Sequence, residues 1–308
     1  MKPILVTCYV NPDLDGYAGV FAYAEFLEKK GIDVIAGIIG NPHDEAKYVL
    51  KKFDLEAIKI IPNDELFDEV ILIDASDING LEGKVRAEKV IEIIDHRKVN
   101  EADKFPKAKA QIELVGAAAT LVAEKFKQEN ISISQGSAIL IYSAIISNTL
   151  NFQSGTTTER DQEMAQWLKQ FIHVSEDYWK ELFMAKSDFT GEELTERIKG
   201  DFAWFILGDK KLGIAQLEIM EAEKLVNQRR DDIISILEEI KKELGLDFIF
   251  LNIIDLEKQK NLIVTNDHPT KDLLERTMNI KFKDTIAVKE QLLMRKQIVP
   301  LIKDELEK

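Results

Sequence analysis

The chain has 308 residues and is 45% hydrophobic, which is enough for two domains with cores of their own. Its net charge of −14, from 55 acidic and 41 basic residues, disfavours an extended nucleic-acid surface but not a small anion held by local cations or metals. The single cysteine, Cys8, excludes an intrachain disulfide and a zinc–thiolate cluster. Because no signal segment and no apolar run of about 18 residues occurs, we expect a cytoplasmic protein without membrane contact, a secreted disulfide-free protein being the alternative.

Short apolar runs alternate with helical patterns in the first half of the chain. The runs are rich in β-branched residues and nearly unbroken in apolarity, as in parallel strands covered on both faces. The expected strands are residues 4–8, 33–39, 57–62, 69–74 and 90–95. The expected helices are one carrying Val20, Tyr23, Ala24 and Leu27 on one face, then 44–53, 116–126, 137–150 and 161–172. We therefore expect an α/β domain with a parallel sheet.

A polar, charged stretch with two glycines precedes a second set of strands and helices. We place the first domain at residues 1–187, the linker at 188–198 and a smaller α/β domain at 199–308. The strands expected in the second domain are residues 202–207, 212–219, 247–254 and 261–265. Near the end, Arg295 and Lys296 lie in an apolar stretch that we expect to be a strand, so this pair needs a partner or an anionic ligand.

Acidic residues follow three of the strands expected in the first domain. Asp13 and Asp15 come after the first strand, Asp74 ends the fourth, and Asp95 with His96 follows the fifth. Ligands of open α/β sheets bind outside the carboxyl ends of strands about 4.8 Å apart, so these side chains can converge on one ion. Each residue alone is as readily a turn, cap or loop residue, but the joint pattern favours a metal site. Carboxylates with an imidazole suit Mn²⁺, with Co²⁺ or Mg²⁺ as alternatives.

The motifs, in this order, resemble those of the DHH phosphoesterase superfamily. "NPDLDG" (11–16), "LIDASD" (72–77) and "IIDHR" (93–97) are similar to its first three motifs, and "SAIISNTLNFQSGTTTERD" (143–161) is similar to the fourth. "KKLGIAQLEI" (210–219) and "MRKQIVPLI" (294–302) resemble a second domain of the DHHA2 type. Length, motif order and the two-domain split resemble the manganese-dependent, family II inorganic pyrophosphatases.

The resemblance implies two domains that close over a phosphoanhydride, with divalent metals activating a water in the cleft between them, and it suggests a homodimer. Carried over by position, the metal ligands would be Asp13, Asp15, Asp74 and His96, with Asp74 bridging two ions. Asp95 would orient His96 from behind. Asp74, Asp95 and His96 would then be the catalytic residues.

Three positions depart from the family's ligand pattern. Tyr9 stands where the family has a histidine ligand and Asn148 where it has an aspartate, so we expect both to be weak metal ligands. Arg97 replaces the second histidine of the DHH triplet; it is no general acid, but its planar fork binds phosphate well. We expect the metal position built from Asp13, Asp74 and Tyr9 to be the weaker one.

The family's cationic run near the C-terminus is also altered. Met294 takes the place of its arginine, or with a one-residue gap Arg295 does, and the sequence leaves both alignments open. Arg295 and Lys296 are the expected phosphate contacts in either case. The lysine expected near the first strand of the second domain aligns with Ala203 and is absent.

These features imply a metal-dependent phosphohydrolase that acts on a phosphoanhydride or phosphoester of a small phosphorylated substrate, pyrophosphate or another. A relative that binds a phosphorylated ligand without turnover is the second hypothesis, indicated by Tyr9 and Asn148. A DHH nuclease or cyclic-dinucleotide phosphodiesterase is the third, indicated by "DLDG" and "DASD". The chain lacks the GGxGH-type motif usual in such enzymes, and its acidic charge disfavours this third hypothesis.

Overall fold

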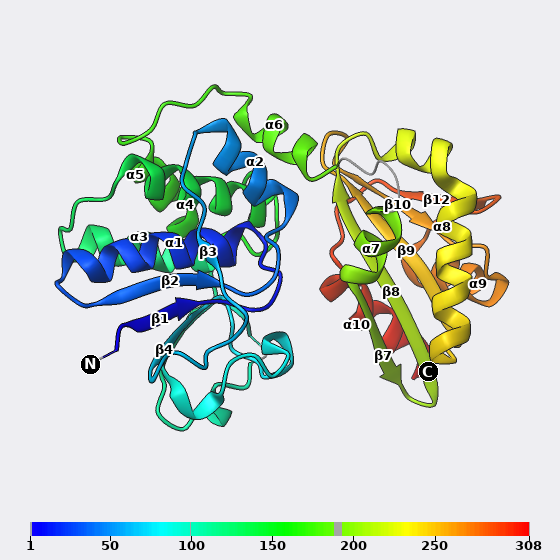
Figure 1. Cartoon of the computed structure of the whole chain (residues 1–308). Coiled ribbons are helices and arrows are strands. Elements are labelled where there is room, and N and C mark those ends of the chain that lie inside the picture. Colours follow the sequence, from blue (N-terminus) through cyan, green and yellow to red (C-terminus); the bar gives the residue numbers. More distant parts are fainter. Residues whose placement is uncertain (1, 99, 188–192, 308) are drawn as a thin grey trace. The chain divides into compact units, whose positions relative to one another are not determined.

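The computed structural model describes residues 2–98, 100–187 and 193–307, which form two compact units divided between Lys186 and Ser187 (Figure 1). Of the segment expected to be a linker, residues 188–192 lie outside the described residues. Residues 193–198 belong instead to helix α7 (Glu193–Gly200) of the second unit. Leu194 and Ile198 are buried in the core of that unit, because residues four apart share one helix face.

The first unit contains a sheet in which the paired strands are all parallel, as the unbroken apolar runs predict. The order across the sheet is β3-β2-β1-β4-β5-β6. The strands are β1 (Ile4–Thr7), β2 (Val34–Ile38), β3 (Lys59–Ile60), β4 (Val70–Ile73), β5 (Val90–Asp95) and β6 (Lys109–Ile112). Strand β6 was not expected, because its half-polar sequence "KAQI" lies at the sheet edge.

The helices of this unit begin after strand ends or follow one another. They are α1 (Leu14–Lys29), α2 (Asp44–Lys52), α3 (Ala118–Gln128), α4 (Gln135–Asn148), α5 (Glu159–Leu168) and α6 (Tyr178–Ala185), with 3₁₀ turns at Asn79–Leu81, Ala87–Lys89 and Ala102–Lys104. Helix α1 approaches β4 closely: a Cβ added at Gly19 would lie 2.4 Å from Cγ2 of Ile73. This contact brings the start of α1 beside the end of β4, where Asp74 follows.

The second unit is a mixed sheet covered by helices on both faces. Its order is β11-β12-β10-β9-β8-β7, with β8 and β9 parallel and the other pairs antiparallel. The strands are β7 (Phe202–Leu207), β8 (Lys210–Ile219), β9 (Phe248–Asp255), β10 (Lys260–Val264), β11 (Phe282–Lys283) and β12 (Ile286–Lys289). One core lies beneath α7 and α8 (Ala222–Leu244), and another beneath α9 (His268–Met278) and α10 (Arg295–Leu306).

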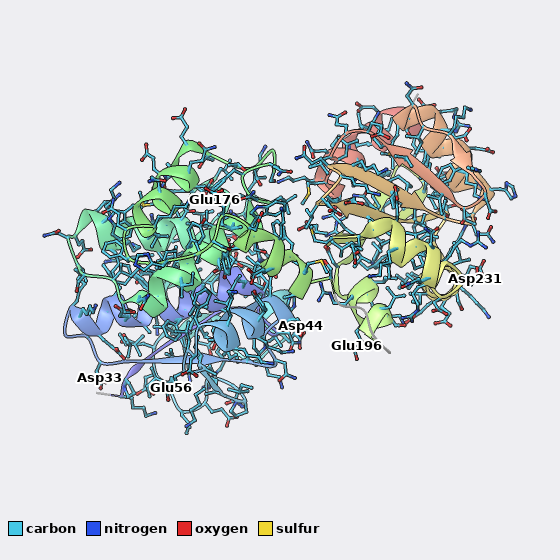
Figure 2. The ribbon with its side chains drawn as sticks, turned by 90° about the horizontal axis from the view of Figure 1, so that it is seen from above. Asp33, Asp44, Glu56, Glu176, Glu196 and Asp231 are labelled. Atoms are coloured by element: carbon cyan, nitrogen blue, oxygen red, sulfur yellow. The ribbon has the colours of Figure 1, made fainter. Side chains whose placement is uncertain are left out.

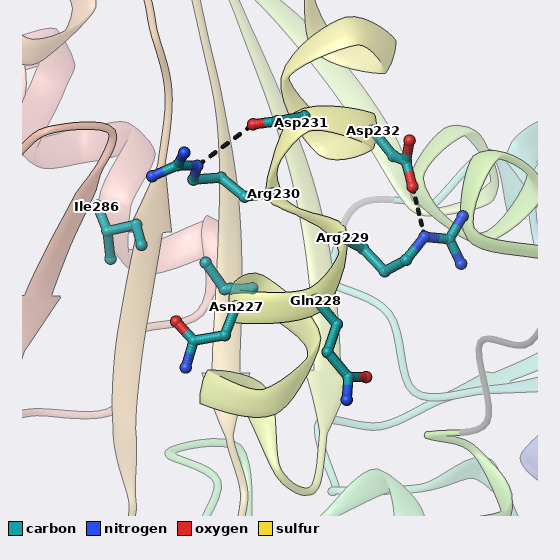
Figure 3. Close-up of a pocket in the computed structure, with 8 residues that line it drawn as sticks. Asn227, Gln228, Arg229, Arg230, Asp231, Asp232 and Ile286 are labelled. Carbon is teal, nitrogen blue, oxygen red and sulfur yellow. Dashed lines mark hydrogen bonds and ion pairs between the residues drawn. The ribbon is translucent and has the colours of Figure 1, made fainter.

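One helix of this unit stands where a strand was expected, and another is interrupted. Arg295 and Lys296 open α10, so the strand expected there is wrong; Ile298 and Ile302 are buried four residues apart, at helical spacing. Helix α8 is interrupted at Arg229, whose φ of −125° and ψ of 19° are not helical. Figure 3 shows that Arg229 pairs with Asp232 and Arg230 with Asp231 beside this interruption.

Acidic side chains are spread over both units rather than gathered on one element. Figure 2 labels the exposed carboxylates of Asp33, Glu56 and Glu176 in the first unit and of Glu196 and Asp231 in the second. Such a surface repels polyanions, in line with the net charge. None of the helices in the described ranges combines the length and the apolar character that a membrane crossing requires.

Candidate metal centre

The structure brings three of the predicted metal ligands together where β4 and β5 end and α1 begins. One ligand atom from each of Asp15, Asp74 and His96 lies within 4.8 Å of the other two. Asp15 is fully buried and Asp74 is 2% exposed, whereas the His96 side chain retains 19% exposure. The two carboxylates are therefore shielded from solvent, whereas solvent reaches the imidazole.

Asp15 lies in the first turn of α1, and its carboxylate reaches the start of α3. Oδ2 accepts a hydrogen bond from the amide of Ala118 and Oδ1 one from the amide of Ala119, both at 2.8 Å. The N-cap of α3, Ala117, offers no side-chain acceptor, so Asp15 caps this helix and is stabilised by its dipole. These two bonds fix the direction of the carboxylate.

Asp74 follows β4 in a left-handed backbone conformation with φ of 54°. This conformation is strained for a residue with a side chain, and such strain collects at functional sites. Oδ1 of Asp74 is buried and has no hydrogen-bond partner among the described residues. Three other buried orphan atoms lie at the same strand ends: Thr7 Oγ1, Ser76 Oγ and Asp95 Oδ2. Buried polar atoms normally have a hydrogen-bond partner, so a group of such atoms without partners indicates a site for a ligand.

The imidazole of His96 is oriented by a main-chain carbonyl. Nδ1 lies 2.9 Å from the oxygen of Val115, which can only accept, so Nδ1 carries the proton and the neutral ring keeps a lone pair on Nε2. That nitrogen lies 3.5 Å from Asp74 Oδ1 and 3.6 Å from Asp15 Oδ2. It therefore points at the two carboxylates, as a metal ligand would.

Asp95 does not lie behind the ring as the resemblance implied. Its Oδ1 instead accepts from the backbone amides of His96, at 2.6 Å, and of Arg97, at 3.2 Å. We expected Asp95 to orient the imidazole of His96, but its hydrogen bonds hold the main chain instead. Asp95 fixes the turn that carries both His96 and Arg97.

The charges of the cluster are strongly coupled. Burial raises the pKa of Asp15 well above its usual range, and the nearby charge of Asp74 raises it further. Burial also raises the pKa of Asp74, although the neighbouring imidazole of His96 acts against this. Burial lowers the pKa of His96, but the close approach and charge of Asp74, with the charge of Asp15, raise it to about 10. The protonation states of these three groups therefore depend on one another, as is typical of functional sites.

The residues fit a divalent cation. Asp74 Oδ1 is a buried acceptor without a hydrogen-bond partner among the described residues, His96 Nε2 has a lone pair when the ring is neutral, and Asp15 Oδ2 lies 3.6 Å from that nitrogen. Two carboxylate oxygens and one imidazole nitrogen suit Mn²⁺, while a thiolate site is excluded because the thiol of Cys8 is buried and its pKa is raised by burial. This group would hold one ion.

Asp13 and Tyr9 do not join the cluster. Asp13 is the N-cap of α1, and its Oδ1 accepts from the amides of Asp15, at 2.9 Å, and Gly16, at 3.0 Å. The amide of Asp13 donates to the phenol oxygen of Tyr9 at 3.0 Å. Burial, then the charges of Asp13 and Asp74, raise the pKa of Tyr9 well above its ordinary value, so the phenol stays neutral. In the described ranges, acidic, histidine and cysteine side chains form no second group of three ligand atoms.

Asn148, at the end of α4, contacts the cluster as a hydrogen-bond donor. Its Nδ2 donates to Asp15 Oδ2 at 2.7 Å. The amide therefore occupies an oxygen that an ion would use, and it brings no charge of its own. Rotating the amide by half a turn would present its oxygen to an ion instead, at the cost of this bond.

Arg97 is held beside Asp74. Its Nη1 pairs with Asp77 Oδ2 at 2.9 Å, and its Nη2 donates to the main-chain oxygen of Asp74 at 3.0 Å. The guanidinium also lies over the ring of Tyr9, 5.4 Å from its centroid. Burial acts to lower the pKa of Arg97, but the charges of Asp74 and Asp95 outweigh it and raise the pKa overall, so the group stays charged. Asp77 belongs to the "DASD" motif, but no pattern in the sequence pairs it with Arg97.

The two cations predicted near the C-terminus differ from each other. Arg295 is occupied: its Nη2 binds Asp201 Oδ1 at 2.7 Å and its Nη1 binds the oxygen of Asp201 at 2.9 Å. Lys296 is exposed in the first turn of α10, where a helix N-terminus favours anions, and partial burial lowers its pKa. Of this pair, Lys296 is the side chain open to a ligand.

Glu45, a buried carboxylate that the sequence did not mark, holds residues that adjoin the cluster. Glu45 of α2 accepts from the amide of Leu14 at 3.2 Å and from the hydroxyl of Ser147 at 2.5 Å. Leu14 lies between Asp13 and Asp15, and Ser147 precedes Asn148. The ammonium of Lys186 lies 3.4 Å from Glu45 and balances its charge. Glu45 is one of several acids in a helical pattern, so no local signal marks it.

Comparison with known proteins identifies the family of the chain. Residues 3–145 match the DHH family, N-terminal domain, and residues 180–305 match the DHHA2 domain. A manganese-dependent inorganic pyrophosphatase of Methanocaldococcus jannaschii is 32% identical, over 96% of each chain, and one of Bacillus subtilis is 28% identical, over 99% of each. A crystal structure of a Methanococcus jannaschii protein assigned to the family II inorganic pyrophosphatases superposes with a TM-score of 0.76, at 30% identity and over 99% of this chain and all of that one. The chain therefore belongs to the family of manganese-dependent inorganic pyrophosphatases, built from a DHH and a DHHA2 domain.

Proposed function

We propose that the chain hydrolyses a phosphoanhydride with Mn²⁺, and that inorganic pyrophosphate is the first substrate to test. The observation that carries this proposal is the buried, unpartnered Oδ1 of Asp74, facing Nε2 of His96 at 3.5 Å. Once the ring has lost its Nε2 proton, the buried oxygen and the imidazole nitrogen can both bind a cation. The named activity of the relatives supplies the substrate class.

A bound divalent ion would lower the pKa of a water and draw off negative charge from a phosphoryl group. The chain's own residues position the reactants. Asp15 and His96 are fixed from behind, by the amides of α3 and by the Val115 carbonyl, so their ligand atoms need no rearrangement. Arg97, 3.7 Å from Asp74 Oδ1, would offer its remaining N–H groups to the anion. In the reaction, a P–O bond to the bridging oxygen breaks and one to water forms, which releases two phosphates from pyrophosphate.

The test is phosphate release from pyrophosphate, tripolyphosphate and a nucleotide panel, with Mn²⁺, Co²⁺ and Mg²⁺ in turn. We expect release from at least one phosphoanhydride, highest with Mn²⁺, and a loss of 10²-fold or more in Asp74→Asn, which keeps the side chain's size but removes its charge. An Asp33→Asn variant, at an exposed site, is the control. Equal activity in wild type and Asp74→Asn would overturn the assigned site.

A second candidate function is ligand binding without turnover. The hydrogen bond from Asn148 to Asp15 favours it, because this bond competes with a metal for the same oxygen. Binding of Mn²⁺ and phosphate without release from any substrate would support this candidate. The nuclease hypothesis has no supporting contact in the described residues.

Several predictions from the sequence extend this proposal. A homodimer, checked by light scattering, and a cytoplasmic location, checked by fractionation, both stay predictions. Lys296 stays the predicted phosphate contact of the second unit, and Arg295 a predicted one whose guanidinium is already bonded to Asp201. A Lys296→Gln variant is expected to raise KM for a phosphoanhydride more than it lowers kcat, since the contact is made in the ground state as well.

A further inference from the structure

We propose that the site takes a single divalent ion and that the guanidinium of Arg97, fixed on Tyr9, supplies its second positive charge. The family resemblance implies two or more ions at this place, and the residues of this chain do not fit that number. The inference rests on the proposed phosphohydrolase function, which it deepens by naming the group that would hold the phosphoryl oxygens.

Asp74 lies close to two cationic groups. Its Oδ1 lies 3.5 Å from Nε2 of His96 and 3.7 Å from Nη2 of Arg97. An ion held with His96 and Asp15 would approach this oxygen from the imidazole side. The guanidinium lies almost as close to the same oxygen as the imidazole does.

Arg97 is a fixed part of the site rather than a mobile surface residue. Three independent contacts hold it: the ion pair with Asp77, the hydrogen bond to the Asp74 carbonyl and the ring of Tyr9 beneath its plane. Arginine over an aromatic face is stabilised by the ring's negative face. An imidazole in place of Tyr9 would offer a lone pair at this position; the phenol offers a platform.

The Asp13 side lacks further ligands among the described residues. Asp13 Oδ1 is used by the helix amides of Asp15 and Gly16, and the phenol of Tyr9 accepts the amide of Asp13. A second divalent ion would have to share Asp74 with the first, and its other ligands there would be Asp13 and a neutral phenol, next to a guanidinium whose charge repels it.

Arg97 has donors to spare. A guanidinium carries five N–H groups, and the described contacts use one on Nη1 and one on Nη2. Nε lies 3.8 Å from Asp95 Oδ1 and Nη2 lies 3.7 Å from Asp74 Oδ1, both beyond hydrogen-bond distance, so three N–H groups make no hydrogen bond among the described residues; the side chain is 34% exposed. A fork of this kind binds two oxygens of a phosphoryl group in a fixed plane, whereas an ion exchanges its ligands.

The experiment measures Mn²⁺ stoichiometry by titration calorimetry and by elemental analysis of the full chain, and then the affinity of inorganic phosphate for the Mn²⁺-loaded protein. Wild type is expected to bind one Mn²⁺ per chain. Arg97→Gln is expected to bind Mn²⁺ about tenfold more tightly, since a repelling charge is gone, and phosphate about tenfold more weakly. Arg97→Lys, which keeps the charge without the fork, is expected to keep the Mn²⁺ affinity and lose phosphate affinity.

Arg86→Gln is the matched control, because Arg86 also pairs with an aspartate of the first unit, Asp64, and is expected to change neither affinity. Two Mn²⁺ per wild-type chain with similar affinities would overturn the inference. So would an Arg97→Gln variant that weakens Mn²⁺ and phosphate binding together, because that result marks a structural role. If wild type releases no phosphate from any substrate, the proposed function fails, while the stoichiometry still decides this inference.

Discussion

The side-chain amide of Asn148 donates a 2.7 Å hydrogen bond to Oδ2 of Asp15, the oxygen that also lies 3.6 Å from Nε2 of His96. This bond joins two residues 133 positions apart in sequence, and it uses an oxygen that we propose as a metal ligand. The bond stabilises the chain without a metal and competes with one.

Replacing this amide by a carboxylate should therefore lower the stability of the metal-free protein and raise its affinity for a metal. Asn148→Asp is expected to destabilise the metal-free protein by about 1–3 kcal/mol, because it buries two carboxylates in contact. Mn²⁺ affinity is expected to rise by about 10–100-fold. Thermal unfolding and calorimetry with and without Mn²⁺ measure both effects; Asn148→Ala, which loses the bond without adding charge, separates them. Unchanged Mn²⁺ affinity in Asn148→Asp would show that this position lies outside the ion's reach.

Metal binding should release a proton. The pKa of His96 is raised to about 10 by Asp74 and Asp15, so the ring of the metal-free chain is protonated at neutral pH, yet Nε2 must lose its proton to bind an ion. Mn²⁺ is expected to bind more tightly as pH rises toward 9. Calorimetry in buffers of different ionisation enthalpy counts the protons; about one per ion is expected, and none would contradict the role of His96.

The raised pKa of His96 also makes the stability of the metal-free protein depend on pH. Because the folded-state pKa of His96 lies above its unfolded value of 6.5, its contribution is fully present below pH 6.5 and is lost as pH rises through about 10. Metal-free protein is therefore expected to lose stability between these pH values, while protein saturated with Mn²⁺ loses less. Denaturant unfolding at pH 6.5 and 9.5 checks this. A His96→Gln variant should remove the metal-free difference.

Glu45 should position the cluster through the main chain. Burial raises its pKa, but the charge of Lys186 and the hydroxyl of Ser147 lower it overall, so the carboxylate is ionised. Glu45→Gln is expected to lower the free energy of unfolding by about 1–3 kcal/mol and to weaken Mn²⁺ binding several-fold, since Leu14 and Ser147 adjoin Asp15 and Asn148. Asp44→Asn, at the neighbouring surface pair with Lys47, is the control and should cost less than about 1 kcal/mol. Equal Mn²⁺ affinity in wild type and Glu45→Gln would limit Glu45 to a role in folding.

The close approach of α1 to β4 should also be measurable at the metal centre. In Gly19→Ala, the new methyl group would lie 2.4 Å from Cγ2 of Ile73, the residue before Asp74. We expect a loss of about 1–3 kcal/mol and weaker Mn²⁺ binding, because the strand end must move. Gly136→Ala, in α4 and 3.3 Å from the flexible Cδ2 of Leu55, is the control and should be neutral or stabilising. Unaltered Mn²⁺ affinity in Gly19→Ala would show that the two features are independent.

Much of the fold was predictable because its signals are local. The apolar runs that became β1, β4 and β5 and the periodicity of α1 depend on neighbouring residues alone. The convergence of Asp15, Asp74 and His96 followed from parallel strands, whose carboxyl ends share one edge. The family resemblance supplied the metal and the substrate class.

The remaining features depend on contacts between distant segments. No pattern in the sequence places the amide of Ala118 or the carboxamide of Asn148 on Asp15, or the carbonyl of Val115 on His96. The start of α10 was misjudged because apolar residues at both ends of "LLMRKQIVPLI" fit a buried strand as well as a helix. Tertiary packing decided between them.

The most direct test of the account is the anomalous scattering of Mn²⁺ in crystals of the wild-type protein. We predict one strong peak in the first unit, within bonding distance of Asp15, Asp74 and His96, with the guanidinium of Arg97 still stacked on Tyr9. A peak coordinated by Asp13 and Tyr9, or the lack of any peak beside Asp74 at saturating Mn²⁺, would contradict it.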